Sequence, residues 1–263
     1  MDSKCKDVMH TFYLITRFLE NALILKGQIN VSAKYLWTLD GMPWKSTKTL
    51  GFVSPRSYLV DQVNGGYFYP SAVLRQLGDK SIDKDSVDMT ISINPNVNFY
   101  FPSMFGQSQE SNQIGAIDVI AHELLHGTGF ATFFRSEANS NISPVIQVLN
   151  PGQYGRSKMN FDISIFEKFI YTQEGDSVAS LVEQMGLCGT VQNPSARDGK
   201  KLLSNCHLYL TKKIEMFATK PGGLVFRTKD EDIYLETSED PLVKGTSISH
   251  LELGYRETDD MII

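Results

Sequence analysis

The segment from Ser111 to Gly127 constrains the fold of this 263-residue chain more than any other. Its apolar residues recur every three or four positions, which predicts an amphipathic helix. The residues of this apolar stripe are Ile114, Ile117, Ile120, Ala121, Leu124 and Leu125. A helix with one apolar face has to bury that face against another layer of structure, so the segment predicts a central element of a packed domain.

The residues before this helix show a mixture of helical and strand-like patterns. Helices are predicted at Val8–Leu25, which has an apolar stripe of helical period, and at Pro70–Leu77, which Gly78 follows. Strands are predicted at Gln28–Leu39, Leu50–Val60 (with a turn at Pro55) and Ser86–Asn94. The expected fold is therefore α+β, with a small mixed sheet beside the helix that ends at Gly127.

The second half of the chain is less regular. Residues 132–158 are polar and carry few signals of secondary structure. Helices are predicted at Phe161–Tyr171 and Ser177–Met185, and Gly223–Arg227 with Asp232–Glu236 predicts a hairpin. We expect two subdomains, residues 1–130 and a looser 131–263, with a cleft between them.

Composition excludes several classes of partner. The net charge is −5, and the densest basic cluster, Arg197, Lys200 and Lys201, is too small for a nucleic-acid interface. No segment has the roughly 20 apolar residues of a membrane span. Polar residues also interrupt Val8–Leu25, so it does not resemble the apolar core of a signal peptide.

Three cysteines are too few for a disulfide scaffold. Cys188 and Cys206 flank a polar stretch and could close a surface loop, which would leave Cys5 unpaired. Two triplets, beginning at Asn30 and Asn141, fit the glycosylation pattern and weakly favour secretion.

The predicted central helix carries the sequence His122-Glu123-Leu124-Leu125-His126, an H-E-x-x-H motif. Residues four apart on a helix lie one turn above each other, so His122 and His126 can bind one Zn²⁺. Glu123 lies one position further round and can reach a metal-bound water without being a ligand. These residue types at this spacing predict one catalytic zinc ion with Glu123 as general base.

A catalytic zinc needs a third protein ligand and one open position. His10 has Asp7 one turn before it but no second histidine nearby, and His207 directly follows Cys206, where adjacent residues rarely converge on one ion. His250 lies in a loop of small polar residues, which can present a side chain to an ion. Glu137 and Glu167 are acidic alternatives. Asp118, one turn before His122, could orient an imidazole or interact with the helix dipole.

Two short segments resemble leishmanolysin-like zinc metalloproteases and related secreted bacterial and fungal enzymes. These segments are Ala121–Phe130, which matches H-E-x-x-H-x-x-G-F, and the Ser249–Glu252 tail with His250. Compact metzincins would have a third histidine at position 132, where this chain has Thr132. The resemblance implies a zincin-like fold, His250 as third ligand, and a methionine turn at Met261.

The resemblance also implies a metalloendopeptidase that hydrolyses peptide bonds with a zinc-bound water assisted by Glu123. Tyr255, five residues after His250, could be a further donor to the oxyanion or a loop aromatic residue that packs on the core. Its partners would be protein or peptide substrates, with the strand Met89–Ile93 as the peptide-binding edge. We expect a monomer that is extracellular or secreted, although the absence of a signal peptide in this sequence leaves a cytoplasmic location open.

The alternative from another class is a zinc-stabilised protein-binding module without catalytic activity. Hydrolysis of a non-protein amide would use the same site. Glu123 favours an enzyme, because the general base serves hydrolysis and not metal binding.

Overall fold

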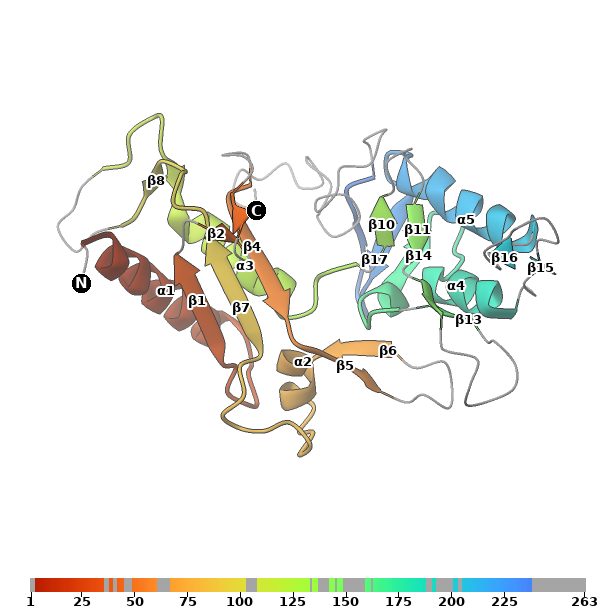
Figure 1. Cartoon of the computed structure of the whole chain (residues 1–263), viewed down its shortest axis with the longest axis horizontal. Coiled ribbons are helices and arrows are strands. Elements are labelled where there is room, and N and C mark those ends of the chain that lie inside the picture. Colours follow the sequence, from red (N-terminus) through yellow and green to blue (C-terminus); the bar gives the residue numbers. More distant parts are fainter. Residues whose placement is uncertain are drawn as a thin grey trace. The chain divides into compact units, whose positions relative to one another are not determined.

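A computed structural model has an α+β architecture of small sheets and helices, which confirms the expected fold class (Figure 1). It describes residues 3–35, 38–39, 42–44, 49–60, 67–102, 108–132, 134–136, 142–144, 146–148, 159–161, 163–187, 191–192, 201–202 and 205–237. The chain divides into two compact units, residues 1–58 with 69–129 and residues 59–68 with 130–262. The second unit therefore includes a segment from early in the chain.

A three-stranded sheet organises the first unit. Strand β7 (Met89–Ile93) lies in its centre, parallel to β1 (Val31–Tyr35) and antiparallel to β4 (Gly51–Pro55). Four of its five side chains are buried, as expected for a strand at the centre of a sheet. All three strands lie within segments predicted as strands, β1 and β7 from their alternation and β4 from a more irregular pattern.

The central position of β7 corrects one prediction. The strand Met89–Ile93 was expected to present an open edge to a peptide, but β1 and β4 occupy both of its edges. Its N–H and C=O groups are therefore used within the sheet. In the sheet formed by the described residues, the edge strands are β1 and β4.

Three helices belong to the same unit as this sheet. Helix α1 (Ser3–Ala22) buries Val8, Phe12 and Ile15, as its stripe predicts. Helix α2 (Ser71–Gln76) follows Pro70 and ends before Gly78, which has a positive φ of 78°. Helix α3 (Ala116–Gly127) packs on β4 and β7 and buries Ile120 and Leu124.

The start of α3 differs from the prediction by five residues. Residues 110–113 form a turn in which the Gln113 N–H donates to the Glu110 carbonyl, so the chain leaves the helical period there. Ile114–Gly115 then forms β9, paired in parallel with β8 (Phe99–Tyr100), and Ile114 is exposed. The apolar stripe predicts the end of this helix better than its beginning.

Short strands complete the first unit and pass into the second. They are β2 (Thr38–Leu39) with β3 (Met42–Pro43), and β5 (Ser57–Val60) with β6 (Tyr67–Pro70). β5 follows β4 after a single residue, Arg56.

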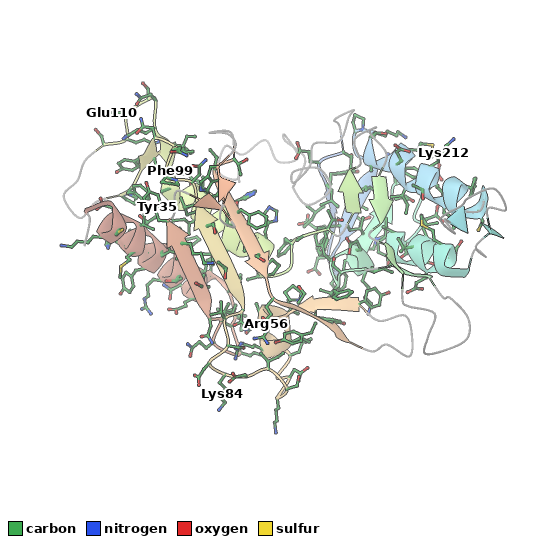
Figure 2. The ribbon with its side chains drawn as sticks, viewed as in Figure 1. Tyr35, Arg56, Lys84, Phe99, Glu110 and Lys212 are labelled. Atoms are coloured by element: carbon green, nitrogen blue, oxygen red, sulfur yellow. The ribbon has the colours of Figure 1, made fainter. Side chains whose placement is uncertain are left out.

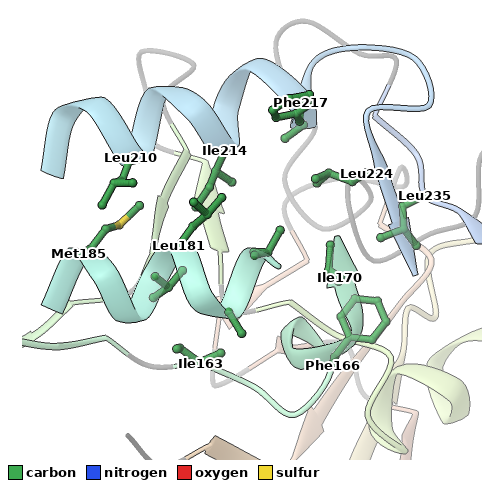
Figure 3. Packing of buried hydrophobic residues seen from close by; sticks show 14 residues of the cluster. Ile163, Phe166, Ile170, Leu181, Met185, Leu210, Ile214, Phe217, Leu224 and Leu235 are labelled. Carbon is green, nitrogen blue, oxygen red and sulfur yellow. The ribbon is translucent and has the colours of Figure 1, made fainter. Parts of the chain in front are cut away.

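The second unit has its own apolar core, formed mainly between α4 (Val178–Leu187), α5 (Asn205–Ala218) and a sheet. The sheet has the order β14 (Ile170–Thr172), β17 (Leu224–Arg227), β18 (Asp232–Tyr234). Figure 3 shows Leu181 and Met185 of α4 facing Leu210 and Ile214 of α5. Short antiparallel pairs complete the unit: β10 (Phe134–Ser136) with β11 (Ile142–Pro144), β12 (Ile146–Val148) with β13 (Met159–Phe161), and β15 (Val191–Gln192) with β16 (Lys201–Leu202).

The predicted helix at Ser177–Met185 and the predicted hairpin are confirmed as α4 and as β17 with β18. The predicted helix at Phe161–Tyr171 is wrong, because the described residues of this segment form only the 3₁₀ turn Glu167–Phe169 (η2) between two strands. Helix α5 was not predicted. No helix among the described residues is long and apolar enough to span a membrane.

Cys206, at the start of α5, is disulfide-bonded, whereas Cys5 on α1 is a free thiol. Cys188, with which the sequence suggested a bond, lies outside the described residues.

Candidate functional site

Helix α3 brings His122 and His126 together as the H-E-x-x-H spacing predicts. Their Nε2 atoms lie 3.0 Å apart, and the ring centroids are 4.4 Å apart with the planes at 88°. Two imidazoles bound to one tetrahedral zinc at about 2.0–2.1 Å would have their nitrogens roughly 3.3 Å apart. The pair therefore fits a shared metal ion after a shift of a few tenths of an ångström.

His122 is held in the form that binds metals. Burial and, to a smaller extent, the neighbouring His126 together lower its pKa to about 4. The imidazole is therefore neutral at neutral pH, with a nitrogen lone pair available for coordination.

Glu123 lies between α3 and the first residues of β4. Only 8% of the residue is exposed, and burial raises the pKa of its carboxyl to about 7, while a hydrogen bond from the Val53 backbone N–H acts in the opposite direction. A Cβ atom at Gly51 would lie 3.1 Å from both Cγ and Oε1 of Glu123. The carboxylate thus occupies the space that a side chain at position 51 would fill.

The backbone of β4 directs polar groups away from the sheet beside Glu123. The Asn94 N–H donates to the Leu50 carbonyl at 3.0 Å, and the Arg56 N–H donates to the Asp88 carbonyl at 2.7 Å. Because hydrogen-bonded and open positions alternate along an antiparallel pair, Gly51 and Val53 face away from β7 with their N–H and C=O groups. The edge of β4 away from β7 therefore runs beside Glu123, the candidate general base.

Two glycines shape the end of α3, for different reasons. Gly129 has a φ of 121°, a left-handed conformation that glycine adopts without strain. Gly127 is instead the last residue within α3. A Cβ atom at Gly127 would collide with the sulfur of Met89 and lie 3.1 Å from Val53, so packing on the sheet requires this glycine.

Asp118 lies in the first turn of α3 and is exposed. Its carboxylate folds back against Gly115, because a Cβ atom at that glycine would collide with Oδ2 of Asp118. This placement at the positive end of the helix dipole is typical of a carboxylate that interacts with the dipole, and not of one that orients an imidazole.

The remaining predicted site residues, His250, Tyr255 and Met261, lie outside the described residues, as does Glu137. His10 lies on α1 and His207 on α5. Among the residues that the structure describes, no group of three or more His, Cys, Asp or Glu side chains could hold a metal ion. The structure therefore brings together His122, His126 and Glu123 of the predicted set.

Glu167, an alternative ligand, has a different set of contacts in the second unit. The residue is 1% exposed, and the Thr132 hydroxyl donates to its Oε1 at 2.7 Å. Its Oε2 accepts hydrogen bonds from the N–H and hydroxyl of Ser164. Both carboxylate oxygens thus accept hydrogen bonds, and the bond from Thr132 ties Glu167 to the segment that follows α3. Thr132 occupies the position at which compact metzincins would have their third histidine.

Sequence reasoning missed Gly51 and Val53 as parts of the site. The signal available was a glycine at the start of a strand-like segment, which indicates that another group approaches the backbone closely. That the approaching group is Glu123 can be seen only once β4 is placed beside α3.

The chain matches one family model, described as SPBPB7E8-like, over residues 1–154, a span that includes α3. It is 27% identical over 234 residues to "Uncharacterized protein PB7E8.01" of Schizosaccharomyces pombe (strain 972 / ATCC 24843). That match covers 73% of this chain and 38% of the relative, so the chain spans well under half the relative's length. No solved structure matches significantly. Since the family model covers more than half of its residues, the chain belongs to the SPBPB7E8-like family.

Proposed function

We propose that this chain is a zinc-dependent endopeptidase. The observation that carries the proposal is the geometry at α3: two imidazole Nε2 atoms converge to 3.0 Å, and a buried carboxylate follows the first of them in sequence. The surroundings of Gly51 and Val53 add a strand edge on which an extended peptide can pair.

The zincin-like form of the fold is part of the same proposal. The parallel pair β1 and β7, the antiparallel edge strand β4 and the helix α3 packed on this sheet support it. The similarity to leishmanolysin-like enzymes rests on the two sequence segments around His126 and His250.

In this proposal His122 and His126 hold one zinc ion together with His250, contributed by the subdomain of residues 131–263. Bound zinc would supply a Lewis acid that polarises the substrate carbonyl and makes a water molecule more acidic. Met261 would support the site from below, and Tyr255 would donate a hydrogen bond to the substrate carbonyl oxygen as charge develops.

Glu123 acts as general base and then as general acid. Its carboxylate accepts a proton from the attacking water and returns it to the amine nitrogen that leaves. Its position against Gly51 fixes it beside the strand edge, where a peptide carbonyl would lie.

The edge of β4 takes the role that was expected for β7. Gly51 and Val53 can each offer a peptide backbone an N–H and a C=O group, so the substrate would bind as an added strand. The Val53 N–H would then exchange its bond with Glu123 for one with the substrate.

An oxidising location agrees with the bonded state of Cys206, since disulfides persist mainly outside the reducing cytosol. We therefore propose an extracellular or secreted enzyme, acting as a monomer on protein or peptide substrates.

Cleavage of unfolded casein by zinc-loaded protein tests the function. We expect hydrolysis that a strong chelator abolishes and added zinc restores, and no hydrolysis by the Glu123→Gln variant at unchanged zinc content. Zinc binding without cleavage of any peptide would instead favour the catalytically inactive binding module.

A further inference from the structure

Among the residues that the structure describes, β4 pairs only with β7, and its other edge carries side chains as well as backbone groups. Successive side chains of a strand point to opposite faces, so Phe52 and Ser54 lie on the face away from α3. Arg56 continues this row, because its N–H still donates to the Asp88 carbonyl of the neighbouring strand segment. Phe52, Ser54 and Arg56 therefore line one face of the edge on which a substrate would pair. We call this row the outer row of β4.

Phe52 gives the outer row an apolar contact point. It is 44% exposed, although phenylalanine is usually buried. An added peptide strand would place a side chain directly beside it, at the distance of about 4.5–5.5 Å typical of cross-strand neighbours. The chemistry that fits beside Phe52 is an apolar or aromatic side chain.

Arg56 gives the outer row a positive charge on a protein of net charge −5. It is exposed, its guanidinium carbon lies 5.2 Å from the centre of the Tyr58 ring, and Figure 2 marks it where β4 passes into β5. Across the parts of the chain that the structure describes, the ion pairs do not include Arg56.

The residue opposite Arg56 is Asp88, and its carboxylate already binds other groups. Asp88, whose carbonyl accepts the Arg56 N–H, is fully buried, and both of its oxygens lie 2.8 Å from Nε of Arg75. The Asn30 N–H donates to the same carboxylate at 2.8 Å. The charge of Asp88 is thus balanced by Arg75, which leaves the charge of Arg56 for a substrate.

The spacing along β4 sets where the substrate's acidic group must lie. The Val53 N–H contacts Glu123, so the substrate residue paired with Val53 is the one nearest the catalytic carboxylate. Arg56 is three residues further along, about 10 Å in an extended strand, and Phe52 is four residues, about 13 Å, from Arg56.

From this placement, and on the basis of the proposed peptidase function, we propose that Arg56 and Phe52 determine substrate specificity. The preferred substrate is an extended peptide with Asp or Glu about three residues from the cleaved bond. An apolar residue, four residues from that acid, lies beside Phe52.

Matched fluorogenic decapeptides test this specificity. Each carries one Phe and, four residues away in either order, Glu or its uncharged counterpart Gln; a second set has a spacing of two. We expect the Glu peptide with the four-residue spacing to have a kcat/KM about three- to fivefold above the Gln peptide, a factor that corresponds to an exposed ion pair. The preference should shrink at high salt.

Arg56→Gln should remove the preference for Glu, and Arg56→Glu should replace it with a preference for Lys. Arg17→Gln is the matched control, since Arg17 is an exposed arginine on α1 paired with Glu20, and it should keep the wild-type preference. Equal kcat/KM values for the Glu and Gln peptides, or a preference that survives in Arg56→Gln, would overturn the assignment.

A binding measurement separates this inference from the proposed function. Fluorescence anisotropy with the same peptides, labelled, and the zinc-loaded Glu123→Gln protein reports recognition without hydrolysis. If wild-type protein cleaves no peptide but binding retains the Arg56-dependent preference, the peptidase proposal fails and the specificity stands. If peptides are cleaved without that preference, only the specificity fails.

Discussion

The carboxylate of Glu123 lies against the bare Cα of Gly51, at the point where β4 passes beside α3. The same carboxylate accepts a hydrogen bond from the Val53 N–H, so the H-E-x-x-H motif on α3 is in direct contact with the edge of β4. The absence of a side chain at position 51 is therefore a condition for the position of the proposed general base.

Gly51→Ala tests this relationship. The added methyl group would lie 3.1 Å from Cγ and Oε1 of Glu123, so we expect displacement of the carboxylate and a fall in kcat of about 10- to 100-fold, with zinc content unchanged. Ser32→Ala, on β1 at the other edge of the same sheet, is the control and should retain activity. Wild-type kcat in a folded Gly51→Ala protein would show that the carboxylate position does not depend on this glycine.

The raised pKa of Glu123 predicts a pH-dependent stability of the metal-free protein. The folded group titrates at about 7 and the unfolded group at 4.5, so between these values only the unfolded chain has lost the proton. The contribution of Glu123 to folding is thus fully present below pH 4.5 and is lost as the pH rises through 7. Glu123→Gln should gain roughly 2–3 kcal/mol in unfolding free energy relative to wild type across this window.

Urea unfolding with a chelator at pH 4.5 and 7.5 measures this difference. His122, whose lowered pKa of about 4 contributes stability that is lost as the pH falls from 6.5 through 4, is present in both proteins and cancels in the comparison. If Glu123→Gln gains the same unfolding free energy at both pH values, burial does not raise the pKa of Glu123.

Gly127→Ala tests the packing of the last turn of α3. Alanine normally stabilises a helix interior by about 1 kcal/mol relative to glycine. Here its methyl group would collide with the Met89 sulfur, and we expect a net loss of about 1–3 kcal/mol. Thermal unfolding of Gly127→Ala should improve when Met89→Val is added, and a double variant no more stable than Gly127→Ala alone would contradict the collision.

The contrast between Gly127 and Gly129 shows what the sequence could predict. The H-E-x-x-H spacing fixes the relation of His122 and His126, because it depends only on helix geometry. The positive φ of Gly129 follows equally from local chemistry. The close approach of Met89 to Gly127 depends on which strand lies under the helix, and alternation alone does not specify that.

Strand order limited the prediction in the same way. The patterns identified β1, β4 and β7, but a strand at the centre of a small sheet and a strand at its edge have similar alternation over five residues. The incorrect helix at Phe161–Tyr171 has another cause. The buried carboxylate of Glu167 accepts hydrogen bonds from the hydroxyls of Ser164 and Thr132, and these bonds hold the segment in a turn.

The pair Arg75 and Asp88 predicts a large difference between buried and exposed ion pairs. Asp88 is fully buried, so Asp88→Asn leaves Arg75 without its counter-charge and should cost about 3–5 kcal/mol. The control is Asp232→Asn, which breaks the arginine pair with Arg227 on the exposed hairpin and should cost less than about 1 kcal/mol. Chemical unfolding of both variants measures the difference; equal losses would mean that Asp88 is not a buried anchor.

Zinc content measured by mass spectrometry of the purified protein tests the metal site most directly. Wild type and Glu123→Gln should each hold about one zinc per chain, since Glu123 is not a ligand. His126→Ala and His250→Ala should lose zinc affinity by orders of magnitude, and the matched His10→Ala should not. Unchanged zinc in His250→Ala would move the third ligand to Glu137, Glu167 or His207. Wild-type protein that binds no zinc, or a His126→Ala variant that binds it as tightly as wild type, would contradict the proposed metal centre.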